Sequence, residues 1–171
     1  ANIDAWWPMV DAGQVEAIIS NASGCGAMLK DYGYALRHDS AYAAKALRVS
    51  ALACDLSELL PALLPELADK LAGRAKVPQQ PMAYHPPCTL QHAQKLKGVV
   101  EANLGKLGFK LMTARTESHL CCGSAGTYSI LQPVISKTLR TRKLQALSEA
   151  VAQPAAILSA NIGCISHLQN G

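Results

Sequence analysis

The chain has 171 residues, half of them apolar, which is enough for one ordinary domain with a hydrophobic core. Its net charge of +4 is too small to predict a nucleic-acid-binding surface. Acidic residues and prolines interrupt the longest apolar stretch (residues 50–68), so no segment is predicted to span a membrane, and no signal peptide is predicted.

The predicted elements alternate between strands and helices along the chain. Short apolar and β-branched runs predict strands at residues 15–21, 81–85, 109–113 and 155–161. Helical spacing of apolar residues predicts helices at residues 89–108 and 132–151, and two more within residues 40–71, divided near Pro61. Residues 73–81 are expected to be a loop. This alternation predicts an α/β fold, with a parallel sheet that carries helices on both faces.

An internal repeat links the two ends of the chain. The segment AIISNASGCGAML (residues 17–29) aligns without a gap with AILSANIGCISHL (residues 156–168). Each copy runs from a predicted strand through a glycine and a cysteine into a predicted helix. The match predicts two copies of one α/β unit rather than a solenoid of short repeats.

Four cysteines follow predicted strands. Cys88 follows the second strand, the adjacent Cys121 and Cys122 follow the third, and Cys164 follows the fourth. Because the carboxyl ends of parallel strands meet at one edge of a sheet, we expect these thiols to lie together. Each is also close to a predicted helix N-terminus, which stabilises a thiolate. Without a secretory signal, such cysteines indicate a reducing compartment and metal binding or catalysis rather than disulfides.

The adjacent cysteines favour a centre with more than one metal ion, since two neighbouring side chains point in different directions. Gly123 and Gly126 would let the backbone approach inorganic sulfide and donate N–H groups to it. His167, one helical turn after Cys164, is a further candidate ligand. Cys25 has the same place in the first repeat and is also a candidate, one that depends on a segment N-terminal to this sequence.

Other residues receive structural or supporting interpretations. His85 and His119 are candidates for hydrogen bonds at the site, whereas His38 and His92 are expected at the surface. Cys54 is expected to lie on a helix among apolar neighbours, as part of the hydrophobic core. The basic segment SKTLRTRK (residues 136–143) is typical of a solvated helix face, or alternatively of a docking patch for an acidic partner.

Three functions remain open from the residues themselves. The first is an iron–sulfur centre held by the four thiols. The second is a structural zinc site in a scaffold domain, made from the same thiols and His167. The third is thiol catalysis, with Cys121 or Cys122 as the nucleophile and His119 as the base.

The motifs together resemble the cysteine-rich CCG domain, which usually occurs in tandem. That domain is found in heterodisulfide reductase, in anaerobic glycerol-3-phosphate dehydrogenase, in lactate-utilisation proteins and in the iron–sulfur subunits of glycolate oxidase. The segments that carry the resemblance, which is strongest to the glycolate oxidase proteins, are NIDAWWP, ASGCGAMLKDYG, CTLQHAQKL, SHLCCGSAGTY and ANIGC. It implies that residues 1–72 are the tail of a first CCG unit with connecting helices, and that residues 73–171 are a second, nearly complete unit. The chain would then be a fragment of a longer protein.

The resemblance also implies a function. Electrons from glycolate, oxidised at a flavin on FAD-binding partner subunits, would pass through a 4Fe–4S centre toward the quinone pool. The module would belong to an FAD-linked glycolate dehydrogenase, inactive alone, in the cytoplasm or peripherally on the cytoplasmic face of the inner membrane. The family's fullest pattern has cysteines where this chain has Met28 and His167, and its cluster in heterodisulfide reductase is non-cubane. The type of cluster, its presence in this fragment, and the choice among glycolate, lactate and glycerol 3-phosphate stay open.

Overall fold

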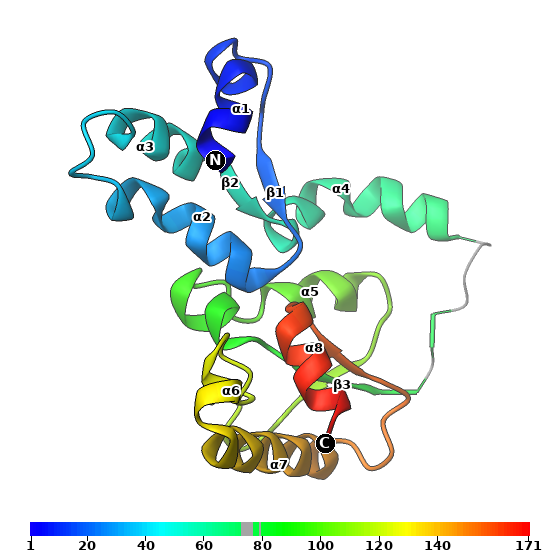
Figure 1. Cartoon of the computed structure of the whole chain (residues 1–171). Helices are drawn as coiled ribbons and strands as arrows, with labels where there is room; N and C mark the ends of the chain where they lie inside the picture. The colour runs from blue at the N-terminus through cyan, green and yellow to red at the C-terminus, as the bar shows by residue number, and fades with distance from the viewer. Residues whose placement is uncertain (73–76, 79) are drawn as a thin grey trace.

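Two small parallel sheets organise the chain (Figure 1). The computed structural model describes residues 1–72, 77–78 and 80–171. In the first sheet, β1 (Ile18–Ser20) pairs with β2 (Ala53–Asp55). In the second, β3 (Met82–His85) lies between β4 (Leu111–Thr113) and β5 (Ile157–Ser159). The predicted α/β fold with parallel pairing is therefore confirmed.

Helices flank these sheets. Helix α7 (Pro133–Ala150) packs against β3 and β4, and α5 (Val99–Lys106) packs against β4. The two helices lie on opposite sides of β3 in Figure 1. All four residues of β3 are buried, as expected for the central strand of a sheet that is covered on both faces. The other helical segments are α1 (Asn2–Asp11), α2 (Ser23–Ala35), α3 (Ala43–Leu52), α4 (Leu56–Leu71), the π-turn η1 (Thr89–Ala93), α6 (Tyr128–Leu131) and α8 (Ile162–Gln169).

The two copies of the repeat adopt the same local structure and touch each other. Each runs from a strand into a helix whose first turn carries the cysteine, as β1–α2 and as β5–α8. The backbone N–H of Ser23 donates to the carbonyl of Ala160 at 3.0 Å, and Asn161 Nδ2 donates to Ser23 Oγ at 3.2 Å. The starts of α2 and α8 are therefore joined by direct hydrogen bonds.

A buried glutamine adds to this junction between the two sheets. Gln94 Nε2, just after η1, donates to the carbonyl of Ser23 at 2.9 Å and to Asp55 Oδ2 at 3.2 Å. Both bonds are buried, where a satisfied polar contact is stronger than at the surface. The segment that follows Cys88 is thus fixed against both α2 and β2.

The predicted division of residues 40–71 near Pro61 is wrong. The break is β2, and α4 continues through both Pro61 and Pro65. Asp55 caps α4 in a capping box with Glu58. Pro61 has no N–H for the carbonyl of Ser57, and Asn103 Nδ2 donates to that carbonyl instead, at 2.8 Å.

Two further expectations need correction, one for the same part of the chain and one for the segment after Cys88. Cys54 lies in β2, half-buried, and not in a helix. The predicted helix over residues 89–108 is interrupted, because Lys95 and Gly98 have left-handed φ values of 59° and 80°, which a right-handed helix cannot accommodate. Only η1 and α5 are helical there.

One prediction about organisation, the division of the chain into two units, stays open. Residues 73–76 and 79 of the expected loop lie outside the described residues, so the boundary between residues 72 and 73 stays a prediction. In the part of the chain that the structure describes, none of the helices has both the length and the apolar character needed to cross a membrane.

Candidate metal centre

Four thiols meet at the carboxyl-terminal edge of the β4–β3–β5 sheet. Cys88 immediately precedes η1 after β3, Cys121 and Cys122 follow β4, and Cys164 lies in the first turn of α8 after β5. Their thiols interact in sequence, Cys88 with Cys121, Cys121 with Cys122, and Cys122 with Cys164. The structure therefore places together the four cysteines that the sequence predicted to converge. Their role as ligands stays a prediction.

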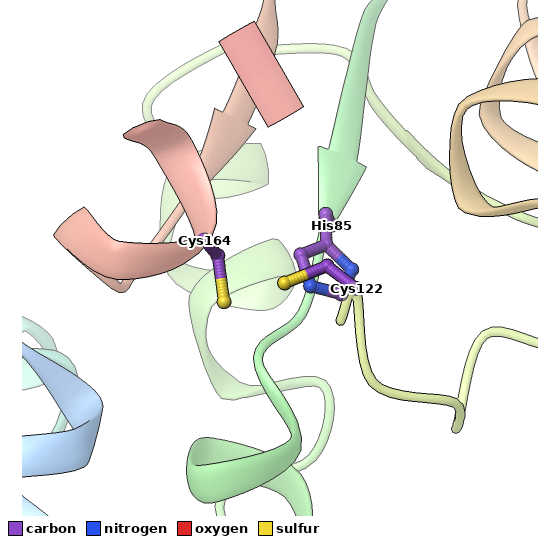
Figure 2. Close-up of side chains that lie close together, drawn as sticks. All are labelled: His85, Cys122 and Cys164. Atoms are coloured by element: carbon purple, nitrogen blue, oxygen red, sulfur yellow. The ribbon is translucent and has the colours of Figure 1, made fainter. Parts of the chain in front are cut away.

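An imidazole lies beside two of these thiols. His85 is the last residue of β3 and is 0% exposed. The ligand atoms of His85, Cys122 and Cys164 all lie within 4.8 Å of one another. Figure 2 shows the three side chains converging from the end of β3, from the loop after β4 and from the start of α8. They form a buried group of one nitrogen and two sulfur donors.

The loop that carries the adjacent cysteines is held against α7 through Gly123. The backbone of Gly123 has a φ of +96°, and a Cβ atom there would lie 2.3 Å from the carbonyl oxygen of Ser136. Ser136 Oγ donates to the carbonyl of Gly123 at 2.8 Å, and the N–H of Gly123 donates to Cys121 Sγ at 3.3 Å. The position requires glycine for both its conformation and its close approach to α7. Gly126, also left-handed, is exposed, with open space around it.

A buried glutamine joins the Cys88 segment to the loop that carries Cys121. Gln91 Nε2 donates to the carbonyl of Pro86 at 2.8 Å and to that of Ser118 at 3.1 Å. Since Gln91 lies in η1, this π-turn holds the segment of Cys88 against the loop that carries Cys121. Such turns are frequent at functional sites.

The contacts among the thiols shift their pKa values in opposite directions. The pKa of Cys164 is lowered to about 5, chiefly by the neighbouring Cys122 thiol and also by His85. The pKa of Cys121 is likewise lowered by Cys122 and Cys88. The pKa values of Cys88 and Cys122 are raised, because both donate to the Cys121 sulfur. These contacts therefore favour negative charge at two of the four sulfurs, those of Cys121 and Cys164.

A buried lysine compensates part of that charge. Lys143 of α7 is 2% exposed, and its Nζ donates to the carbonyl of Glu117 at 2.5 Å. Burial lowers the pKa of Lys143, while the nearby Cys122 thiol and Glu117 favour its charged form. The interpretation of residues 136–143 as a wholly solvated basic face is therefore wrong at this position. Lys137 on the same helix is exposed, as expected.

Three other predicted residues have different surroundings. His167 Nε2 lies 3.3 Å from Ser136 Oγ and 3.4 Å from the carbonyl of Ser136, so it contacts α7 behind Gly123. Cys25 is exposed on α2, and no described contact joins it to the other thiols. His119 is exposed, and its carbonyl, not its ring, contacts the ring of His92.

This arrangement fits a soft metal centre. Sulfur and imidazole donors suit zinc and iron–sulfur clusters better than hard cations. Cys122 and Cys164 are buried, and the ring nitrogens of His85 have no hydrogen-bond partner of ordinary geometry among the described residues. The donors are thus gathered in one place, and three of them, His85, Cys122 and Cys164, are buried. Cys88, Cys121, Cys122, Cys164 and His85 are the residues positioned to hold one.

Two of these features had only weak signals in the sequence. His85 was expected to form hydrogen bonds rather than to join the donor group, although its place at the end of a buried strand, three residues before Cys88, indicated the right edge of the sheet. Lys143 lies one helical heptad after Ser136, and both face the loop of Gly123. This spacing places both residues on one face of the helix, and it was the feature of the sequence that could have indicated a buried lysine.

Comparison with known proteins gives a consistent result. The model of the family described as "CCG: Cysteine-rich domain" matches residues 82–169. The chain is 53% identical over 167 residues to the "Glycolate oxidase iron-sulfur subunit" of Escherichia coli, covering 98% of this chain and 39% of that protein. It is 29% identical over 157 residues to the "Lactate utilization protein A" of Geobacillus kaustophilus, covering 88% of this chain and 60% of that protein.

These figures also define how much of each relative the chain represents. It spans 39% and 60% of the length of the two relatives, so neither is matched over its whole extent. No solved structure matches the chain. The matched region, residues 82–169, contains the whole group of four thiols together with His85. The chain belongs to the CCG cysteine-rich domain family.

Proposed function

We propose that this chain is the cysteine-rich part of an iron–sulfur subunit, and that it holds a 4Fe–4S centre and relays electrons through it. The observation that carries the proposal is the convergence of four thiols and an imidazole at one sheet edge. The two relatives add support, since one is named as an iron–sulfur subunit of glycolate oxidase and the other as a lactate-utilisation protein.

Different residues of the chain would hold such a centre, tune its reduction potential and exclude water from it. Cys88, Cys121, Cys122 and Cys164 would hold the cluster, which when bound supplies one-electron oxidation and reduction. The backbone N–H of Gly123 donates to Cys121 Sγ, and hydrogen bonds to sulfur are among the contacts that set the reduction potential of such centres. Burial of Cys122 and Cys164 excludes water from one side of the site.

The wider reaction follows from the similarity to the glycolate oxidase protein. In this proposal, FAD-binding partner subunits oxidise glycolate, and electrons pass from their flavin through the centre toward quinone. The proposal locates this complex in the cytoplasm, or peripherally on the cytoplasmic face of the inner membrane. A lactate-oxidising complex is the counterpart suggested by the second relative, and purified complexes assayed with each acid distinguish the two.

Metal and sulfide analysis tests the proposal directly. The intact protein, purified anaerobically, is expected to contain iron and acid-labile sulfide in equal amounts, with a paramagnetic signal in one oxidation state. A folded sample with neither iron nor sulfide would contradict the proposal.

A structural zinc site is the second candidate function, and one observation favours it. His85, Cys122 and Cys164 with one further thiol make the mixed nitrogen and sulfur set that tetrahedral zinc accepts. In that case the chain would be a scaffold that docks the flavin-binding partner. Stoichiometric zinc without sulfide in the same analysis would support the scaffold and exclude the electron relay.

The buried lysine leads to a prediction about the reduction potential. Lys143→Met removes a positive charge beside the thiols while keeping a side chain of similar length. The reduced centre, which is more negative, loses more stabilisation than the oxidised one. The midpoint potential is therefore expected to fall by about 60 mV, a tenfold change in a one-electron equilibrium. An EPR-monitored redox titration measures this shift.

The matched control for this prediction is Lys137→Met. Lys137 lies on the same helix but is exposed, so solvent screens its charge. Its replacement is expected to leave the potential within experimental error. Equal shifts in the two variants would show that Lys143 has no special effect on the centre.

A further inference from the structure

The donor group contains a buried imidazole, that of His85, which has no role in the four-thiol cluster proposed above. His85 is completely buried, and neither Nδ1 nor Nε2 has a hydrogen-bond partner of ordinary geometry among the described residues. The polar neighbours of the ring are Cys122 and Cys164, and a thiol is a weak hydrogen-bond partner, so the buried imidazole is poorly compensated by the protein alone. The histidine is also fixed in place, since it ends the central strand β3 in register with Ser159 of β5.

The direction of the side chain indicates what that partner is. The ring reaches toward Cys122 and Cys164, and the three ligand atoms lie within 4.8 Å of one another (Figure 2). Donor atoms around one tetrahedral metal ion lie about 3.5–3.8 Å apart, given bonds of about 2.3 Å to sulfur and about 2.0–2.1 Å to nitrogen. The imidazole therefore lies within ligand range of a metal centre held by these thiols.

The other histidine near the site, His167, already contacts α7. His167 Nε2 contacts both the hydroxyl and the carbonyl oxygen of Ser136, and it packs behind Gly123. His167 Nε2 is directed at α7, whereas the ligand atoms of His85 lie within 4.8 Å of two thiol sulfurs, so His85 is the imidazole placed beside the other donors. His167 instead positions the loop of Cys121 and Cys122 against α7.

We propose that His85 is a direct ligand of the metal centre, binding iron of the centre through a ring nitrogen beside Cys122 and Cys164. The proposal rests on the iron–sulfur function proposed above and specifies its donor set as mixed nitrogen and sulfur. A neutral imidazole adds a donor to the four thiolates without adding negative charge.

Pulsed EPR on the intact protein tests this ligand assignment. The protein is produced with ¹⁵N-labelled histidine and purified anaerobically, and its iron and sulfide are measured on the same sample. The paramagnetic centre is expected to show a hyperfine coupling to ¹⁵N. This coupling is expected to persist in His167→Gln and to disappear in His85→Gln and in His85→Cys, which supplies a sulfur ligand if glutamine prevents cluster binding.

The outcomes separate this inference from the function on which it rests. Iron and sulfide present without a histidine coupling in the unsubstituted protein would overturn the assignment of His85 and leave the electron relay intact. A coupling that survives in His85→Cys, or that is lost in His167→Gln with iron retained, would equally overturn it. Absence of iron and sulfide from the unsubstituted protein would overturn the proposed function itself.

Discussion

Replacement of Cys122 by alanine is expected to remove the centre completely. Cys122 is fully buried and is the only thiol that contacts both Cys121 and Cys164 among the described residues. Without it, the donors on the β4 side and the α8 side no longer share a common neighbour. The intact Cys122→Ala protein is therefore expected to lose about four iron atoms per chain, with the matching sulfide. Iron and sulfide analysis after anaerobic purification measures the loss.

Two cysteines outside the group provide matched controls. Cys54 is half-buried in β2, and Cys25 is exposed on α2. Cys54→Ala and Cys25→Ala are both expected to retain the full iron content of the centre. Iron lost from Cys25→Ala to the same extent as from Cys122→Ala would restore Cys25 to the ligand set, where the sequence had placed it as a candidate.

A methyl group at Gly123 is expected to have the largest effect on stability. In Gly123→Ala the new Cβ would lie 2.3 Å from the carbonyl oxygen of Ser136, and the φ of +96° is unfavourable for alanine. Backbone strain and overpacking together are expected to lower the free energy of unfolding by about 3 kcal/mol. Urea denaturation of the metal-free protein, followed by circular dichroism, gives this difference.

Gly126→Ala separates the two causes. Gly126 also has a left-handed φ, of +58°, but nothing lies within 4 Å of a Cβ atom built there. Its replacement is expected to cost about 1 kcal/mol, from conformational strain alone. If the two variants unfold with the same free energy, the close approach of Gly123 to α7 contributes nothing to stability.

The sequence was most informative where residue type and strand position agreed. Cysteines in the segments that follow predicted strands indicated one edge of a parallel sheet, and the structure gathers Cys88, Cys121, Cys122 and Cys164 there. The repeat was equally reliable, because glycine and cysteine at matching positions fix the same turn from strand to helix. Both inferences depend on local chemistry that recurs wherever the fold recurs.

The errors came where a distant residue changed the local preference. Pro61 usually ends or kinks a helix, yet α4 continues because Asn103 donates to the carbonyl that the proline leaves free. The three-residue strand β2 has no turn residues around it, so its apolar run resembled a helix. The Asp55–Glu58 capping box was the one local signal for the true helix start.

The site itself was only partly predictable for a similar reason. The sequence cannot show that His85 lies beside two thiols while His167 contacts Ser136, since both depend on which elements pack together. Nor can it show that Lys143 faces the thiols rather than solvent. Burial and partners are properties of the assembled fold, and they decide between candidate donors of the same type.

The separation of the donors along the chain has a consequence for biosynthesis. Cys88 follows β3, the first strand of the second sheet along the chain, whereas Cys164 lies in α8, which follows the last strand, β5, and β5 pairs with β3. During translation the N-terminal donors emerge well before Cys164 is made, when the site is still open on one side. Contacts between such distant segments form late in folding. The complete donor group therefore depends on the pairing of β5 with β3, a contact between segments that are far apart in the chain.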